Sequence, residues 1–132
     1  RDLRQKLGMA IVWITHDLGV IAGIADRVIV MYGGQIVEQA PVKELFGNPQ
    51  HPYTRALLKT IPHVTGARAA KLNVIEGQPP ILRAAPSACP FRARCVHAFD
   101  RCAKENPPRI PVKPGHDVAC FWDPATGGPR DA

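Results

Sequence analysis

The chain has 132 residues, a length that fits one ordinary domain, and 17 Lys and Arg against 11 Asp and Glu give it a formal net charge of +6. The basic residues are spread along the chain in short doublets, which favours an ordinary solvated surface over a nucleic-acid-binding face. No stretch approaches the roughly 20 apolar residues that span a bilayer, and the first residues lack the apolar core of a signal peptide. We therefore expect a cytosolic protein.

The composition changes along the chain. Ten of the fourteen prolines and all four cysteines lie after Gln78, whereas residues 9–61 carry nearly all the long aliphatic runs. This unevenness predicts two units, each small for an independent core. In the second unit the prolines exclude long helices and central strands, so something other than a large apolar core must hold it together.

The first predicted elements are those of an α/β sheet. Residues 1–7 read as the end of a helix that Gly8 stops. Residues 10–14 are continuously apolar, as expected of a parallel strand that is covered on both faces, which implies a sheet whose other strands are absent from this chain. Apolar residues then recur at helical spacing over 18–25, so residues 15–17 form a strand-to-helix turn.

A hairpin follows. Residues 28–32 and 35–39 read as two strands, and Gly33 with Gly34 forms the tight turn between them. This edge of the sheet is therefore expected to be antiparallel.

Two short helices come next. Pro41 starts the first, which ends at residues 47–49, and Pro52 opens the second, which Pro62 closes. Residues 63–78 give only weak signals.

His16 is the chemical clue in the first half. A polar turn at the carboxyl end of a buried parallel strand is where open α/β sheets bind ligands, and anions suit it because helix amides point outward there. The histidine either caps the turn or contacts a phosphate or substrate.

The four cysteines indicate a metal-type ligand set: Cys89, Cys95, Cys102 and Cys120. Their C-x5-C, C-x6-C and C-x17-C spacing departs from paired zinc knuckles and from the bacterial ferredoxin run, and a reducing cytosol disfavours structural disulfides. Wider spacing lets a loop wrap a larger object, such as a cuboidal cluster. Six basic and two acidic residues between Arg92 and Lys113 suit the charge of about −2 that four thiolates give either [4Fe-4S] or zinc, so charge does not choose the metal.

Four short segments of the first half form a recognisable set: Ile14-Thr15-His16-Asp17-Leu18, Ala25-Asp26-Arg27-Val28, Met31-Tyr32-Gly33-Gly34 and Ile36-Val37-Glu38. Together they resemble the tail of an ABC-transporter ATPase domain. Residues 41–46 and 48–58 are similar to the oligopeptide/dipeptide importer branch specifically, and the whole resemblance covers residues 1–123. It implies an α/β fold: the C-terminal fragment of a P-loop ABC ATPase domain, a partial sheet plus helices, followed by a small, irregular, cysteine-rich extension.

The resemblance also assigns roles. His16 would contact the ATP γ-phosphate and help orient the attacking water in the full subunit, which also binds Mg, and Asp17 would lie beside the dimer interface; positioning and charge stabilisation are what phosphoryl transfer asks of a protein. The G-x-x-x-x-G-K-[ST] phosphate loop and the apolar strand ending in Asp-Glu are both missing from the sequence. We therefore expect a portion of a longer ATPase subunit, one that does not hydrolyse ATP alone.

The cysteines resemble the C-terminal extension of peptide-importer ATPases, which implies a [4Fe-4S] cluster; zinc and metal-free thiols stay open. A catalytic cysteine is not expected, because no Cys-His pair forms a recognisable motif, and His97 and His116 are predicted to be surface groups. A structural staple is the leading role, since metal-binding free energy becomes folding free energy, with regulation by cluster loss as the second.

Three hypotheses for function follow. The first is part of the ATP-binding subunit of an ABC importer that couples ATP hydrolysis to oligopeptide or dipeptide uptake. It divides the chain into the ATPase piece with His16 (1–40), a helical connection (41–78) and the four-cysteine extension (79–132). Its partners would be a second ATPase subunit, transmembrane permeases and, indirectly, a periplasmic or extracellular peptide-binding protein, with no nucleic acid, at the cytoplasmic face of the bacterial inner membrane.

The second hypothesis is an autonomous four-cysteine metal-binding module with a regulatory or interaction role. The third is a nucleic-acid binder that stacks bases on its aromatic residues Phe91, Phe99, Phe121 and Trp122. Those residues lie beside the cysteines, where packing around a metal site explains them more simply. The first hypothesis carries a structural prediction as well: residues 10–14, without neighbouring strands, should leave apolar surface exposed.

Overall fold

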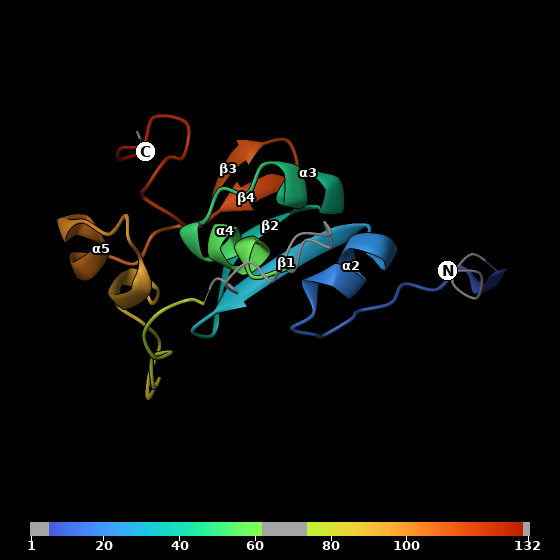
Figure 1. The fold of residues 1–132 in the computed structure, drawn as a ribbon, viewed down its shortest axis with the longest axis horizontal. Coiled ribbons are helices and arrows are strands. Elements are labelled where there is room, and N and C mark those ends of the chain that lie inside the picture. The colour runs from blue at the N-terminus through green and yellow to red at the C-terminus, as the bar shows by residue number, and fades with distance from the viewer. Residues whose placement is uncertain (1–5, 62–73, 131–132) are drawn as a thin grey trace, which may run out of the picture.

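The computed structural model describes residues 6–61 and 74–130, which form short helices around a four-stranded antiparallel sheet of order β1-β2-β4-β3 (Figure 1). The elements, in chain order, are α2 (Leu18–Ile24), β1 (Arg27–Tyr32), β2 (Gln35–Pro41), α3 (Val42–Gly47), α4 (Pro52–Lys59), the 3-10 helix η1 (Arg92–Arg94), α5 (Asp100–Lys104), β3 (Ile110–Lys113) and β4 (His116–Val118). The expected α/β class, a partial sheet with helices and an irregular cysteine-rich end, is confirmed. No helix in the described part of the chain is both long enough and apolar enough to span a bilayer.

The predicted hairpin is present as β1 and β2. Residues of β1 alternate between buried and exposed, with Val28, Val30 and Tyr32 inward and Ile29 and Met31 outward, as a strand with one covered face requires. The turn residues Gly33 and Gly34 have φ values of +55° and +71°, in the region that glycine enters without a steric penalty. The antiparallel edge is therefore confirmed.

This turn touches the cysteine-bearing part of the chain. A Cβ atom placed on Gly33 would lie 2.7 Å from the Cβ of Pro90, closer than real side chains approach one another. Glycine is thus required here twice, by the backbone conformation and by the contact with the residue after Cys89.

The helices begin where the sequence predicts them. Asp17 caps α2, since its Oδ1 accepts the backbone N–H groups of Gly19 (2.9 Å) and Val20 (3.2 Å). α3 follows Pro41, and α4 has Pro52 in its first turn. The helix predicted for residues 1–7 falls mostly on residues 1–5 and the weak segment mostly on residues 62–73, both outside the described ranges.

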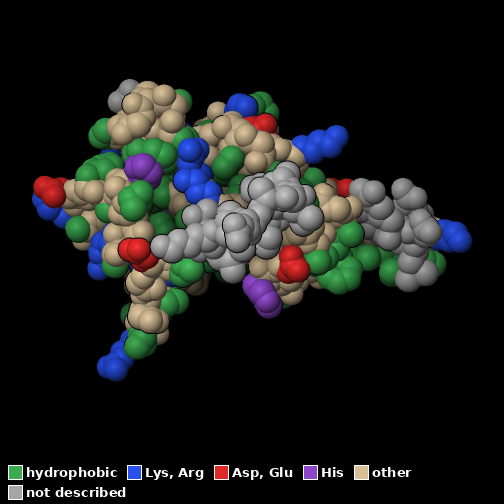
Figure 2. Space-filling model, in the orientation of Figure 1, with side chains coloured by type: hydrophobic (Ala, Val, Ile, Leu, Met, Phe, Trp, Pro, Cys, Tyr) green, Lys and Arg blue, Asp and Glu red, His purple; other side chains and the backbone are tan. Residues whose placement is uncertain are grey.

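The strand predicted for residues 10–14 is wrong. None of these residues belongs to a strand, and Val12 and Ile14 are 88% and 96% exposed. A parallel strand needs neighbours that accept its backbone hydrogen bonds and cover both its faces, and the described sheet provides none at this position. The prediction of exposed apolar surface is confirmed, and Figure 2 shows hydrophobic side chains gathered on the side where Figure 1 places α2 and the N-terminal segment.

The exclusion of central strands after Pro79 is also wrong. β4 lies between β2 and β3, with Glu38 opposite Val118, and the N–H of Ala119 donates to the carbonyl of Val37 at 2.9 Å. β4 contains no proline, whereas Pro111 sits on the edge strand β3, where a missing N–H can face away from the ladder. The prolines lie in the loops and on the edge strand, and they do not interrupt the three residues of β4 that pair in the centre of the sheet.

The apolar core crosses from the hairpin into the cysteine-bearing part. The rings of Tyr32, Tyr53 and Phe91 meet with centroids 4.6 to 5.2 Å apart. Phe91, Phe121 and Trp122 are buried and Phe99 is partly buried, so these rings do not form the exposed stacking surface that the nucleic-acid hypothesis required. In Figure 2 the Lys and Arg side chains are scattered over the visible face rather than gathered into one patch.

Candidate functional site

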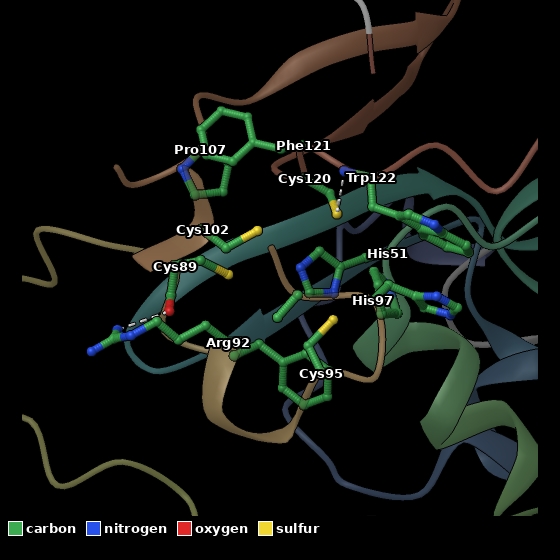
Figure 3. A pocket seen from close by; sticks show the side chains of 13 residues that line it. His51, Cys89, Arg92, Cys95, His97, Cys102, Pro107, Cys120, Phe121 and Trp122 are labelled. Atoms are coloured by element: carbon green, nitrogen blue, oxygen red, sulfur yellow. Dashed lines mark hydrogen bonds between the residues drawn. The ribbon is translucent and has the colours of Figure 1, made fainter. Parts of the chain in front are cut away.

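Four local elements bring the four cysteines to one small cavity (Figure 3). Cys95 ends η1, Cys102 lies in α5, Cys120 follows β4 by two residues, and Cys89 precedes the turn that leads into η1. Figure 3 shows their sulfur atoms directed toward a common space, and all four are free thiols. The grouping predicted from the sequence therefore exists in space as well as in composition.

Backbone hydrogen bonds fix these positions without any metal. The N–H of Cys89 is shared between the carbonyls of Cys102 and Glu105, each at 3.1 Å. The N–H of Trp122 donates to Cys120 Sγ at 3.4 Å, the kind of amide-to-sulfur bond that surrounds thiolate-held centres. The loop is therefore tied to α5 and to the end of β4.

Burial disfavours the thiolate form of Cys89, Cys95 and Cys120. Burial raises the pKa of Cys120 to about 12, and it also raises the pKa of Cys89 and Cys95, although backbone hydrogen bonds partly oppose it. A protonated, buried thiol is a poor nucleophile. A metal centre bound here would displace these protons, because the thiolate is the ligand.

The described side chains form no ready cage for a single ion. Within residues 6–61 and 74–130, no three His, Cys, Asp or Glu side chains come close enough to hold one metal ion together. A zinc site brings four donors to about 2.3 Å from one ion when they are sulfurs. What fits a metal here is the chemistry of the donor set, four inward-facing soft sulfurs, rather than preformed coordination geometry.

His51 lines the same cavity and was not identified from the sequence. It is the N-cap residue of α4 and only 1% exposed, and its Nδ1 accepts the backbone N–H of Tyr53 at 3.0 Å. Burial lowers the pKa of His51 to about 3, so the ring is neutral. A polar residue directly before Pro52 at a helix start was a signal for the cap, but nothing local indicates that the ring faces the cysteines.

Glu38 on β2 is a second missed residue. Its fully buried carboxylate accepts the backbone N–H groups of Gln50 (2.7 Å) and His51 (2.9 Å), and His116 Nε2 is hydrogen-bonded to it at 2.8 Å. One side chain thus connects β2, the start of α4 and β4. A buried carboxyl group is tolerated here because both of its oxygens have hydrogen-bond partners.

The prediction that His116 is a surface group is wrong, because its strand is central in the sheet and its ring is hydrogen-bonded to the buried Glu38 side chain. Its side chain is fully buried, with Nδ1 3.5 Å from Glu44 Oε1. His97 is exposed as predicted, and its ring stacks on Trp122 with centroids 3.8 Å apart.

His16 lies apart from this site. It is exposed, it does not line the cysteine cavity, and the capping role considered for it belongs to Asp17. Among the described residues, the His16 ring therefore takes no part in capping α2.

The comparison with known proteins matches both halves of the chain. Residues 37–102 fit the model of the oligopeptide/dipeptide transporter C-terminal region. A probable peptide ABC transporter ATP-binding protein of Sinorhizobium fredii is 46% identical over 120 residues, which is 91% of this chain and 36% of that protein. A putative peptide import ATP-binding protein of Brucella ovis is 46% identical over 123 residues, or 93% of this chain and 39% of that protein.

The chain thus spans less than two fifths of the length of these relatives. The matched region contains most of β2, all of α3 and α4, and three of the four cysteines. It also includes Glu38 and His51. Because this model matches one half of its length, the chain belongs to the family of oligopeptide/dipeptide transporter C-terminal regions.

Proposed function

We propose that the chain is part of the ATP-binding subunit of an ABC importer that couples ATP hydrolysis to the uptake of oligopeptides or dipeptides. The observation that carries this proposal is the 46% identity to peptide import ATP-binding proteins over more than nine tenths of the chain. The complete subunit binds ATP and Mg, pairs with a second ATPase subunit and docks on transmembrane permeases at the cytoplasmic face of the bacterial membrane. A separate peptide-binding protein delivers the solute.

Within this proposal His16 contacts the γ-phosphate and helps orient the attacking water. The exposed ring directly before the capped start of α2 supports the role, because an unengaged side chain is available to a nucleotide held by the rest of the subunit. Alone, the chain is expected not to hydrolyse ATP, since it contains no phosphate-binding loop sequence.

The test is a chimera. The chain replaces the matching segment of the Sinorhizobium fredii relative, which is produced with its own partner subunits, and peptide uptake and ATP hydrolysis are measured in membranes. We expect an active transporter that loses activity by about 10²-fold or more on His16→Ala, the usual scale for one lost transition-state contact. His97→Ala is the matched control and should change neither rate. A chimera that assembles but neither transports peptide nor hydrolyses ATP would refute the assignment.

The four cysteines, we propose further, hold a [4Fe-4S] cluster that staples the extension. The chemistry of the donor set supports this proposal, because four cysteines line one cavity and thiolate sulfurs are the ligands of iron-sulfur clusters. The basic residues between Arg92 and Lys113 suit its negative charge. When bound, the cluster would contribute its binding free energy to folding.

Anaerobic purification of the chain, with iron, sulfide and zinc quantified, tests the cluster. About four irons and four sulfides per chain, with a broad charge-transfer band that Cys95→Ser abolishes, are expected. One zinc without iron would replace the cluster by a zinc staple. A metal-free chain would remove the metal centre altogether.

A further inference from the structure

One nitrogen of a buried side chain has no role in either proposal. His51 Nε2 has no hydrogen-bond partner among the residues that the structure describes, although the ring is 1% exposed. Figure 3 shows the ring reaching into the space among the cysteine sulfurs, with the nitrogen not used by Tyr53 foremost. A ring nitrogen that opens onto a cavity is available to a group held there.

The cap of α4 decides which nitrogen carries the proton. The Tyr53 backbone N–H can only donate, so Nδ1 of His51 must offer its lone pair to it. A ring whose Nδ1 accepts a hydrogen bond has no proton on Nδ1 and therefore carries its proton on Nε2. The group that faces the sulfurs is therefore an N–H donor.

The same hydrogen bond excludes His51 as a metal ligand. A histidine that binds a metal through one nitrogen almost always donates the N–H of the other to a neighbouring acceptor. In His51 the other nitrogen, Nδ1, accepts a hydrogen bond instead of donating one. Metal binding at Nε2 would therefore require either breaking the bond that caps α4 or removing the last proton of the ring.

The ring is held in this orientation from two sides. Glu38 accepts the backbone N–H of His51 at 2.9 Å, which anchors the start of α4 to β2. The ring of Phe91 lies against it with centroids 5.8 Å apart, tilted by 56°. Glu38 is thus a positioning residue for His51.

We propose that His51 donates a hydrogen bond from Nε2 to a sulfur atom of the cluster held by Cys89, Cys95, Cys102 and Cys120, and that this bond makes the reduction potential of the cluster more positive. Hydrogen bonds to cluster sulfurs are among the terms that set such potentials, because a donor favours the state with one more negative charge. The inference rests on the proposed cluster. It assigns to His51 a role that the four ligands do not provide.

The test compares the whole chain with two variants, each purified anaerobically. His51→Asn keeps an acceptor for the Tyr53 N–H, since asparagine is a good N-cap residue, but its shorter side chain withdraws the donor from the sulfurs. His97→Asn removes the other histidine that lines the cavity and serves as the matched control. Iron and sulfide content, far-ultraviolet circular dichroism and the midpoint potential from an electrochemical titration are measured for all three.

The expected result is a more negative midpoint potential for His51→Asn at unchanged iron content and secondary structure, with His97→Asn equal to the original chain. An unchanged potential in an iron-loaded His51→Asn variant overturns the role of His51 and leaves the cluster standing. A chain without iron and sulfide overturns both the cluster and this inference.

A second measurement covers a His51→Asn variant that fails to fold. Pulsed electron paramagnetic resonance on the reduced His97→Asn chain, with ¹⁵N-labelled histidine, should detect a weakly coupled histidine nitrogen near the cluster. The absence of that coupling overturns the hydrogen bond.

Discussion

Glu38 has no exposed surface, and its two carboxylate oxygens receive two backbone N–H groups and the His116 ring. Glu38→Gln replaces one of these acceptors by an amide group that faces donors. We expect it to lower the free energy of unfolding by about 2 kcal/mol, the scale of hydrogen bonds to a charged group. Urea denaturation followed by circular dichroism measures the change.

The matched control for that substitution is Glu105→Gln. Glu105 forms an exposed pair with Arg101, Oε2 to Nε at 3.1 Å, and such pairs contribute less than about 0.5 kcal/mol. If both substitutions lowered the free energy of unfolding equally, burial of the Glu38 side chain would not be the reason for its contribution to stability.

Glu44 sets a pH dependence. The hydrogen bond from Lys113 Nζ (2.7 Å) and a second from Asn48 lower the pKa of Glu44 to about 2, from an ordinary value of 4.5. Between these values the unfolded chain binds more protons at this site than the folded chain, so the stability contributed by Glu44 is present above pH 4.5 and is lost as the pH falls toward 2. Lys113→Met should raise the midpoint of the Glu44 carboxyl in a ¹³C nuclear magnetic resonance titration. An unmoved midpoint would contradict the assigned cause.

At the scale of elements, β4 is the joint between the hairpin and the cysteines. Ala119→Pro removes the N–H that donates to Val37, leaves a buried carbonyl without its partner and should cost about 1 to 3 kcal/mol. Because Cys120 follows directly, we expect its thiol to react faster with iodoacetamide in the metal-free chain, as measured by mass spectrometry. Ala125→Pro is the control, since the Ala125 N–H bonds only to Asp123 in an exposed turn. Equal reactivity of Cys120 in both variants would show that β4 does not hold it.

The elements that the sequence predicted correctly are those that local signals determine. The β1–β2 hairpin follows from alternating burial and a Gly-Gly turn, and α3 and α4 follow from prolines at their starts. Residues 10–14 carried an equally strong local signal, but a strand exists only where another strand pairs with it. β4 was missed for the converse reason: three residues suffice when β2, almost eighty residues earlier, provides the partner.

The sequence predicted only part of the candidate site, the four cysteines. The four cysteines stand out by composition, and their meeting at one cavity was expected from their clustering. The burial of His51, Glu38 and His116 depends on pairings between distant segments, which no local pattern encodes. A histidine at a helix start looks the same in sequence whether its ring faces solvent or sulfur.

At the scale of the whole molecule, the exposed segment around Trp13 should drive association. Val12, Trp13 and Ile14 are consecutive in the chain and all exposed, and exposed apolar side chains of this kind join molecules in solution. Light scattering of the isolated chain should show an apparent mass that rises with concentration. The double substitution Val12→Asp with Ile14→Asp should reduce that rise, whereas Val96→Asp, at a residue exposed elsewhere, should not. A constant monomer mass over a wide concentration range would contradict this prediction.

The order of the strands also bears on how such extensions pass between proteins. Because β4 pairs with β2 and His116 bonds to Glu38, the cysteine-bearing segment is not a cassette that recombination can append to an unrelated protein. A new host would need a matching acidic residue on its own hairpin and a glycine where Pro90 comes close. Inheritance of the extension is therefore tied to inheritance of the hairpin.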